Sequence, residues 1–235
     1  MISEEHKNVK GIYGTIRLKK HIENKLKIVL NHKLIRRYKR ILGLETVKRT
    51  KKGLANMKSK EKNLTNKAPY LIECNFNSEK PRQKFSSDVS YIKCKDGILY
   101  LSAIKDYFNT EIVSFSTSNY NNIDLIKESY KDLNPTKDSI VNTDQGSVYF
   151  AYEYIELSKT LGFTRSMSHK GHCWENCPIE NWFMQLKHEW LCQFNKLTRK
   201  EAEEEIKKYV HWYNNERIQK KLGYLSPVQY RLKYS

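Results

Sequence analysis

The stretch from Ser166 to Leu191, SMSHKGHCWENCPIENWFMQLKHEWL, constrains the fold of this chain most. It predicts a polar, glycine-containing loop that leads into an amphipathic helix beginning near Pro178, where the missing N–H of proline is harmless. Asn176 or Cys177 would precede it as the cap. Large apolar residues recur at helical spacing and predict one buried stripe, formed by Ile179, Trp182, Phe183, Leu186 and Trp190.

Two charged residues accompany that stripe. Glu180 and Lys187 lie seven positions apart, which is two helical turns, so both project from one face of the helix. For this helix alone an ordinary surface pair is the favoured interpretation, and a functional face is the alternative that the rest of the chain supports.

The net charge of +17 is concentrated at one end of the 235-residue chain. Residues 1–67 contain 20 Lys and Arg against 5 Asp and Glu, whereas the remainder contains 23 against 21. Such a concentration of positive charge at one end of the chain favours a polyanionic partner, most simply nucleic acid. A basic membrane-surface segment is the alternative, but this region lacks a strong apolar face rich in Trp or Phe. No stretch approaches a membrane span or a signal peptide, so no membrane partner is expected.

Two short helices are predicted in the basic region. The first lies between Gly14 and Asn24, and the second begins at the cap Asn31 and stops at Gly43. The apolar side of the second helix would consist of Leu34, Ile35, Tyr38, Ile41 and Leu42, and its other faces carry His32, Lys33, Arg36, Arg37, Lys39 and Arg40. We expect a small all-α helix-turn-helix domain over residues 1–47 that contacts DNA through Lys33, Arg36, Arg37 and Arg40. A solvated basic helix without DNA contact is the alternative.

Residues 48–77 are expected to form a basic linker, and residues 78–235 the main domain with C-terminal helices. Strands are predicted at 85–94, 97–103, 111–116 and 139–142, with a turn at Lys95-Asp96-Gly97 and a further extended piece from Phe163. Helices are predicted at 121–133, 148–161, 199–214 and from Pro227. This order of elements is typical of an α/β layer fold with a mixed sheet.

Two aspartates of this domain occupy unusual positions. Asp88 lies inside a strand, where aspartate is disfavoured, and Asp144 directly follows a short apolar strand. Together with Glu180 they would repel one another unless cations lay between them. Hard oxygen ligands suit Mg²⁺ or Mn²⁺, and two such ions support phosphodiester chemistry. The acids Asp106, Glu111, Asp124 and Asp138 are expected to be turn or cap residues instead.

The loop before the Glu180 helix also contains metal-binding residue types. His169, His172, Cys173 and Cys177 are close in sequence, but their spacing lacks the paired pattern of structural zinc sites, so zinc is not favoured. Cysteines number five, without the spacing of a disulfide framework, and reduced thiols in a cytoplasm are expected. We expect Trp174 to pack in the core rather than to stack on a nucleic-acid base.

Several ordered motifs together resemble a known family. The motifs are YGTIRLKKHI, LNHKLIRRYKRILGL, EKPRQKFSSDVSYIK around Asp88, NTDQGSVY around Asp144, SMSHKGHCWENCPIENWFMQLKHE around Glu180 and HWYNNERIQKKLGYLSPVQY. From Gly11 onward the chain resembles the DDE transposases of bacterial insertion sequence family three, as the second-reading-frame product with a retroviral-integrase-like core. The 35 residues between Asp144 and Glu180, and the basic Lys187 seven positions later, match the spacing of that family.

The resemblance implies an RNase H-like mixed sheet with flanking helices, in which Asp88, Asp144 and Glu180 bind two Mg²⁺ ions, with Mn²⁺ as a substitute. It implies DNA cleavage at the ends of the element, joining of the freed 3′-OH to another strand, and a DNA contact for Lys187. Expected partners are element-end and target DNA, further copies of the chain on DNA, and an upstream-frame product, all at a bacterial nucleoid. The alternatives are a catalytically inactive end-binding protein or repressor, and a structure-selective nuclease on the same fold.

Overall fold

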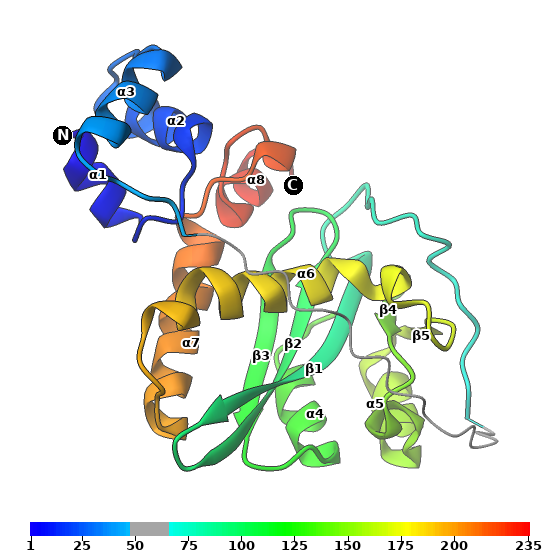
Figure 1. The fold of residues 1–235 in the computed structure, drawn as a ribbon. Coiled ribbons are helices and arrows are strands. Elements are labelled where there is room, and N and C mark those ends of the chain that lie inside the picture. The colour runs from blue at the N-terminus through cyan, green and yellow to red at the C-terminus, as the bar shows by residue number, and fades with distance from the viewer. Residues whose placement is uncertain (48–65) are drawn as a thin grey trace.

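Figure 1 shows a five-stranded sheet with helices on both faces and a group of three further helices beyond one end of it. The computed structural model describes residues 1–47 and 66–235. The strand order is β3-β2-β1-β4-β5. The sheet combines an antiparallel meander of β1 (Lys84–Cys94), β2 (Gly97–Asp106) and β3 (Ile112–Ser118) with two strands parallel to β1, which are β4 (Ile140–Thr143) and β5 (Thr164–Met167).

Alternating residues along β2 show why helices cover both faces. Leu101 and Ala103 belong to a core shared with α6 (Cys177–Gln185) and α7 (Arg199–Asn215). Ile104 belongs to a second core shared with α4 (Ile123–Tyr130) and α5 (Tyr152–Leu161). Because successive side chains of a strand point to opposite faces, one strand contributes to both cores. The predicted mixed α/β sheet is confirmed.

The helix after the glycine-containing loop buries all five residues of its predicted stripe. Asn176 is its N-cap residue, and α6 is followed by a π-helical turn, η3 (Leu186–Trp190), and a short 3₁₀ turn, η4 (Leu191–Gln193). The sequence pattern predicted one uninterrupted helix and did not indicate this π turn. Such turns are often found at functional sites. The predicted helix 148–161 is likewise divided, into η1 (Ser147–Phe150) and α5, by an extended residue at Ala151.

The N-terminal helices differ from the prediction in two respects. They are α1 (Ile2–Asn8), which was not predicted, α2 (Thr15–Leu26) and α3 (His32–Ile41). Asn31 caps α3 as expected, with its side chain accepting the Lys33 N–H at 2.9 Å. The predicted apolar side of α3 is wrong except at Ile35, because so small a unit covers only one of these residues; the four left exposed are Leu34, Tyr38, Ile41 and Leu42.

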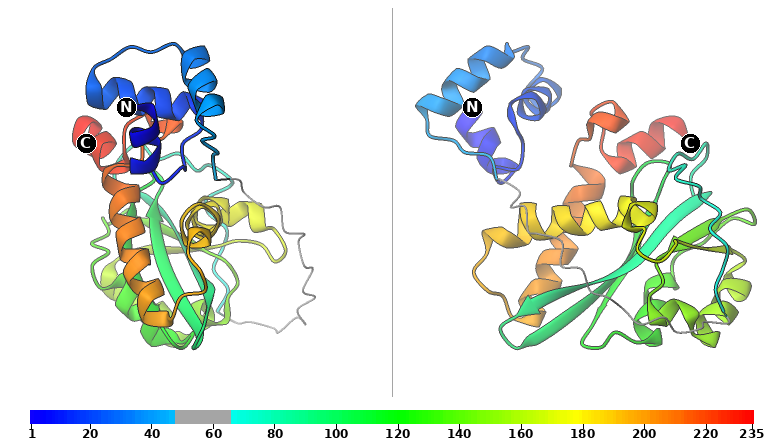
Figure 2. Two further views of the ribbon diagram at one scale, coloured as in Figure 1. Left: turned by 60° about the vertical axis from the view of Figure 1, so that its left-hand side comes forward. Right: turned by 45° about the vertical axis from the view of Figure 1, so that its right-hand side comes forward.

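These helices pack directly on the rest of the molecule, beyond one end of α7 (Figures 1 and 2). The fully buried Tyr13 accepts a hydrogen bond from the Ile218 N–H at 3.0 Å, and its ring centroid lies 6.2 Å from that of Trp212. The Lys10 ammonium lies 3.6 Å from the ring centroid of Trp190 in η3. The N-terminal unit is therefore continuous with the core on the α6–α7 face.

The expected linker lies partly outside the described residues, which resume at Asn66. From there the chain follows the edge of the sheet: the Leu71 N–H donates to the Ser166 hydroxyl at 2.9 Å, and the Met167 N–H donates to the Pro69 carbonyl at 3.1 Å. At the other end of the chain, η5 (Lys220–Leu222) and α8 (Pro227–Tyr234) follow α7. In the described part of the chain, every helix is too short or too polar to cross a membrane.

Candidate active site

Two of the predicted acids lie on neighbouring strands of the sheet. β1 and β4 pair in parallel as far as Ser86 opposite Asn142, and Asp88 and Asp144 each follow two residues later. Phe85 belongs to the core on the α4–α5 face, so the alternation along β1 turns Asp88 towards the α6 face. Parallel strands lie about 4.8 Å apart, so the register brings the two aspartates together.

The buried amide of Asn142 fixes the start of α6 above these strands. Its nitrogen donates to the Glu175 carbonyl at 2.9 Å and to the Asn176 side chain at 3.3 Å, and its oxygen accepts from the Ser166 hydroxyl at 2.9 Å. From β2, the Lys105 ammonium donates to the Pro178 carbonyl at 2.9 Å. Glu180 follows two residues later, in the first turn of α6.

The electrostatics indicate that the three carboxyl groups share one site. Burial, followed by the neighbouring Asp144 carboxylate, raises the pKa of Asp88 well above its usual range, and Glu180 adds to the effect. Burial and Asp144 likewise raise the pKa of Glu180. Burial raises the pKa of Asp144, against a hydrogen bond of 2.8 Å from the Gly146 N–H. The like-charge part of the shifts at Asp88 and Glu180 arises because carboxylates are held close together, and bound cations relieve it.

The carboxyl oxygens are spread more widely than the ligands of one ion. Among the described residues, the one group of three such ligands within 4.8 Å of one another is His169, His172 and Glu175. The acids Asp88, Asp144 and Glu180, which all lie in the described part of the chain, do not form such a group, and two ions about 4 Å apart would span a wider set of ligands. An oxygen-only ligand set suits Mg²⁺ or Mn²⁺.

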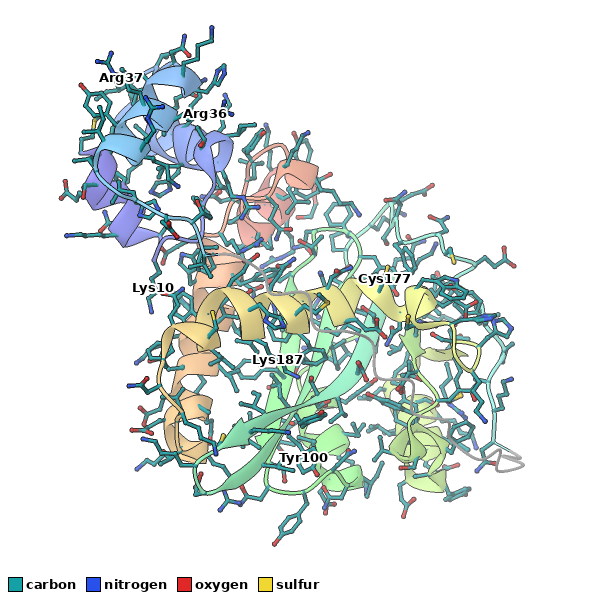
Figure 3. All side chains as sticks on the ribbon, in the orientation of Figure 1. Lys10, Arg36, Arg37, Tyr100, Cys177 and Lys187 are labelled. Carbon is teal, nitrogen blue, oxygen red and sulfur yellow. The ribbon has the colours of Figure 1, made fainter. Side chains whose placement is uncertain are left out.

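Lys187 extends from the π turn towards the strands (Figure 3). Its ammonium donates to the Ser90 hydroxyl at 2.6 Å and lies 5.1 Å from the ring centroid of Tyr91. Burial lowers the pKa of Lys187, and the nearby Asp88 carboxylate counteracts part of that shift. The Lys187 ammonium therefore lies against β1, near the Asp88 carboxylate.

A cavity of about 240 Å³ adjoins the acids, lined by Asp144 and Glu180 and by the loop from Ser168 to Cys173. Trp174 in this loop region is 54% exposed and stacks on His172, with ring centroids 4.5 Å apart. The expectation that Trp174 packs in the core is therefore wrong, because the 3₁₀ turn η2 (Cys173–Asn176) buries Glu175 and Asn176 and turns the indole outwards.

The basic candidates of the N-terminal unit lie on the exposed side of α3: Lys33, Arg36, Arg37 and Arg40. Figure 3 shows Arg36 and Arg37 far from Lys187. Lys39 is instead buried and donates to the Thr46 hydroxyl at 2.7 Å, so it does not belong to the exposed basic face.

One of the other acids stabilises a turn, and two residues of the site were not predicted from the sequence. Asp106 accepts the N–H groups of Arg82 and Phe108, as expected of a turn acid. Sequence reasoning missed Asn142, although it opens the motif NTDQG, because an asparagine in a short strand gives no sign of its buried partners. It also missed Glu175, which the fold brings to two histidines.

Comparison with known proteins identifies the family. The model described as "Integrase core domain" matches residues 78–173, and a second model of the same description matches residues 180–234. Asp88 and Asp144 lie in the first match, and Glu180 is the first residue of the second.

Curated bacterial relatives match over most of their lengths. An uncharacterized transposase-like protein of Haemophilus influenzae is 36% identical over 87% of this chain and 94% of the relative. The transposase for insertion sequence element IS904 of Lactococcus lactis is 32% identical over 98% of this chain and 93% of the relative. The putative transposase InsK for insertion sequence element IS150 of Escherichia coli is 31% identical over 98% and 81%.

Solved structures of low sequence identity share the fold. The catalytic core domain of HTLV-2 integrase in complex with magnesium has a TM-score of 0.51 at 16% identity, covering 65% of this chain and 97% of that one. A chain of the simian T-cell lymphotropic virus intasome has a TM-score of 0.57 at 13% identity, covering 98% and 74%. The fold is thus that of the retroviral integrase core, which is RNase H-like. The chain belongs to the bacterial insertion-sequence transposases that carry an integrase core domain, of insertion sequence family three.

Proposed function

We propose that Asp88, Asp144 and Glu180 are the catalytic residues of this transposase and that together they bind two Mg²⁺ ions, which Mn²⁺ can replace. The observation that carries the proposal is the geometry: Asp88 and Asp144 each lie two residues beyond the paired Ser86 and Asn142, and Glu180 lies in the first turn of α6. The raised pKa values of Asp88 and Glu180, to which Asp144 contributes, agree with it. A set of three repelling carboxylates without a cation is unfavourable, and its all-oxygen chemistry fits these metals.

The family's activity, phosphodiester cleavage and strand transfer, gives each part of the site a role. When bound, the metal pair would supply the Lewis-acid chemistry that activates an attacking oxygen and neutralises charge on the departing 3′-oxygen. In the first reaction water cleaves the phosphodiester at the element end and frees a 3′-OH. In the second, that 3′-OH attacks a phosphorus of the target strand and displaces another 3′-oxygen. The three carboxylates hold the metals, and the half-buried site limits access of bulk water.

The remaining predicted DNA contacts complete this proposal. Lys187 would exchange its hydrogen bond to Ser90 for a phosphate of the element end, because a cation beside the acids is placed to counter DNA charge. Residues 1–47 would act as the helix-turn-helix domain, with Lys33, Arg36, Arg37 and Arg40 on DNA, residues 48–77 as the linker and residues 78–235 as the catalytic core. DNA as substrate would locate the protein at the bacterial nucleoid, where copies of the chain assemble on the element ends.

Conservative substitution of the acids tests the proposal. Asp88→Asn, Asp144→Asn and Glu180→Gln keep the side-chain shape but remove the charge, so each should lower Mg²⁺-dependent nicking and joining of element-end DNA by roughly 10³-fold. Gel-shift binding of the same DNA without Mg²⁺ should stay as in the unchanged protein. Asp138→Asn and Glu128→Gln, on exposed positions away from the site, are matched controls that should keep full activity.

Three outcomes would contradict this assignment. Full activity of Glu180→Gln would remove Glu180 from the catalytic set. DNA binding by the unchanged protein without Mg²⁺-dependent nicking would favour an end-binding protein or repressor. Hydrolysis products without any joined strands would favour a structure-selective nuclease.

A further inference from the structure

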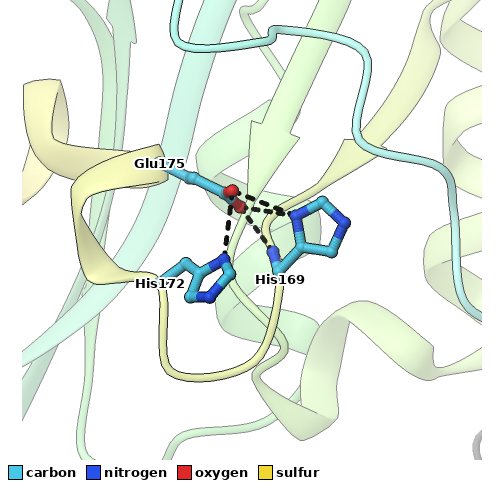
Figure 4. Close-up of side chains that lie close together, drawn as sticks. All are labelled: His169, His172 and Glu175. Atoms are coloured by element: carbon cyan, nitrogen blue, oxygen red, sulfur yellow. Dashed lines mark hydrogen bonds and ion pairs between the residues drawn. The ribbon is translucent and has the colours of Figure 1, made fainter.

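Three potential metal ligands converge on one loop outside the proposed catalytic acids (Figure 4). His169 follows β5, His172 precedes η2, and Glu175 lies within η2. The His169 Nδ1 lies 3.0 Å from both carboxylate oxygens of Glu175, and the His172 Nδ1 lies 3.3 Å from one of them. All three ligand groups lie within 4.8 Å of one another.

These separations match the edges of a metal coordination shell. Nitrogen and oxygen ligands lie about 2.0–2.2 Å from Zn²⁺, so neighbouring ligand atoms of a tetrahedral site are about 3.3 Å apart. The two nitrogen–oxygen distances at Glu175, 3.0 and 3.3 Å, are close to that value. A cation can therefore enter between the imidazoles and the carboxylate after small side-chain adjustments.

The loop holds these ligands in place. Glu175 is buried; its carbonyl accepts the Asn142 amide, and its carboxylate accepts the His169 backbone N–H. Trp174 stacks on the His172 ring, and the Tyr70 ring meets that of His169 edge-on at 5.4 Å. Because ordering free side chains opposes metal binding, a site whose ligands are already oriented binds more tightly.

We propose that His169, His172 and Glu175 form a transition-metal site, selective for Zn²⁺ over Mg²⁺, separate from the catalytic acids. Two imidazoles and one carboxylate suit Zn²⁺, whereas Mg²⁺ prefers oxygen ligands. Three protein ligands leave a coordination position for water or a DNA group, as in open zinc sites. Both histidines line the cavity that Asp144 and Glu180 also line, so the bound ion fixes the loop at the edge of the active site.

The structure assigns this site to a different set of ligands from the one that the sequence suggested. The zinc site that the sequence suggested but did not favour combined the two histidines with Cys173 and Cys177. In the described residues, the group that meets the 4.8 Å limit contains Glu175 and neither cysteine. The competing explanation for the cluster is a metal-free clamp, in which both rings donate Nδ1–H to Glu175.

Metal titration separates the two explanations. The full chain without a histidine tag is stripped with EDTA, dialysed, and titrated calorimetrically with Zn²⁺ in excess Mg²⁺, which competes with Zn²⁺ for the proposed oxygen-only site. We expect one Zn²⁺ per chain and a rise in melting temperature. His169→Ala and His172→Ala should each weaken Zn²⁺ binding by at least about 100-fold, since even indirect metal contacts are worth about 10–100-fold.

Matched variants keep the test specific. His211→Ala removes an exposed histidine on α7, and Cys173→Ser removes the neighbouring thiol; both should bind Zn²⁺ like the unchanged protein. Both site histidines are partly exposed, so their alanine variants should fold, as melting curves without metal would check. His172→Asn replaces His172→Ala if the alanine variant does not fold.

A spectroscopic measurement provides an independent check. Trp174 is 54% exposed, whereas the other three tryptophans are at most 8% exposed, so accessible indole emission arises at the site. Co²⁺ should quench this emission in the unchanged protein and not in His172→Ala. Absence of Zn²⁺ binding by the unchanged protein, unaltered binding by both histidine variants, or loss of binding in Cys173→Ser would each overturn the proposal. These results do not depend on DNA cleavage, so this proposal and that for the catalytic acids can fail separately.

Discussion

At the residue scale, Asn142 joins the sheet to the loop and helix of the candidate active site. Its single buried amide contacts Ser166, Ser168, Glu175 and Asn176. Asparagine suits this position because it donates and accepts at once, whereas an ionised aspartate only accepts. The position of Glu180 over the two aspartates thus depends on a residue with no chemical role of its own.

Asn142→Ala is expected to lower both stability and activity. The substitution leaves several buried polar groups without a partner, which should reduce the free energy of unfolding by about 3 kcal/mol. Urea denaturation measures this loss, and DNA nicking should fall in protein that is still folded. Asn142→Asp should not restore activity, because it cannot donate to the Glu175 carbonyl. Normal nicking by Asn142→Asp would show that this donor is unimportant.

Asp106 predicts a pH dependence of stability. Burial raises its pKa to about 6, and the nearby Glu111 adds to this, although N–H groups of Phe108 and Arg82 oppose the shift. The folded state then holds the proton more tightly than the unfolded state, so stability decreases as pH rises from about 4 to about 6. Relative to Asp106→Asn, the unfolding free energy of the unchanged protein should fall by about 3 kcal/mol across this range. Urea denaturation at several pH values measures it, and a constant difference would refute it.

At the element scale, the π turn η3 is held to the segment that follows α7 by a buried ion pair. The Arg217 guanidinium donates to the Glu189 carboxylate at 2.9 Å, and both side chains are almost fully buried. In the same turn, the Trp190 indole N–H donates to Glu205 at 3.0 Å. These contacts fix the turn that carries Lys187.

Arg217→Ala is expected to reduce the free energy of unfolding by about 3–5 kcal/mol, because it removes the guanidinium that pairs with the buried Glu189 carboxylate. The double variant Glu189→Leu/Arg217→Met removes both charges and should lose much less. Chemical denaturation of the single and double variants compares them. Equal losses in the two variants would mean that packing, and not the buried charge of Glu189, dominates.

At the scale of the whole molecule, the N-terminal unit, residues 1–47, contains 12 Lys and Arg against 4 Asp and Glu. It is docked on the end of α7 through Tyr13 and Trp212. The helices α3 and α6 belong to one packed body, because Ile35 of α3 and Ile179 of α6 lie in the same apolar core. DNA bound at α3 would therefore have a defined orientation towards the acids.

Removing charge from α3 tests this arrangement. Arg36→Ala/Arg37→Ala should weaken DNA binding and reduce the slope of log affinity against log salt by about 2, because each lost phosphate contact removes about 0.9. Lys127→Ala/Lys131→Ala removes the same charge from exposed positions in and directly after α4 and is the matched control. Binding measured at several salt concentrations gives both slopes. Equal reductions in the two variants would indicate a general charge effect without a defined surface.

Much of this protein follows from its sequence alone. Apolar spacing predicted the strands, the main helices and the buried stripe of α6, because burial of periodic apolar residues dominates the free energy of each element. The same patterns predicted that Asp88 lies within a strand, that Asp144 follows a strand and that Glu180 lies in the first turn of a helix. Their common role was predicted from motifs and spacing and stays a proposal.

Only the tertiary structure decided those features that depend on contacts between residues distant in sequence. The π turn, the exposure of Trp174 and the burial of Lys39 follow from packing that no local pattern records. The group of His169, His172 and Glu175 likewise required a 3₁₀ turn to bring a carboxylate to two imidazoles. Local periodicity specifies which face of an element is apolar, whereas contacts between elements decide which polar atoms meet, because several arrangements satisfy the same apolar pattern.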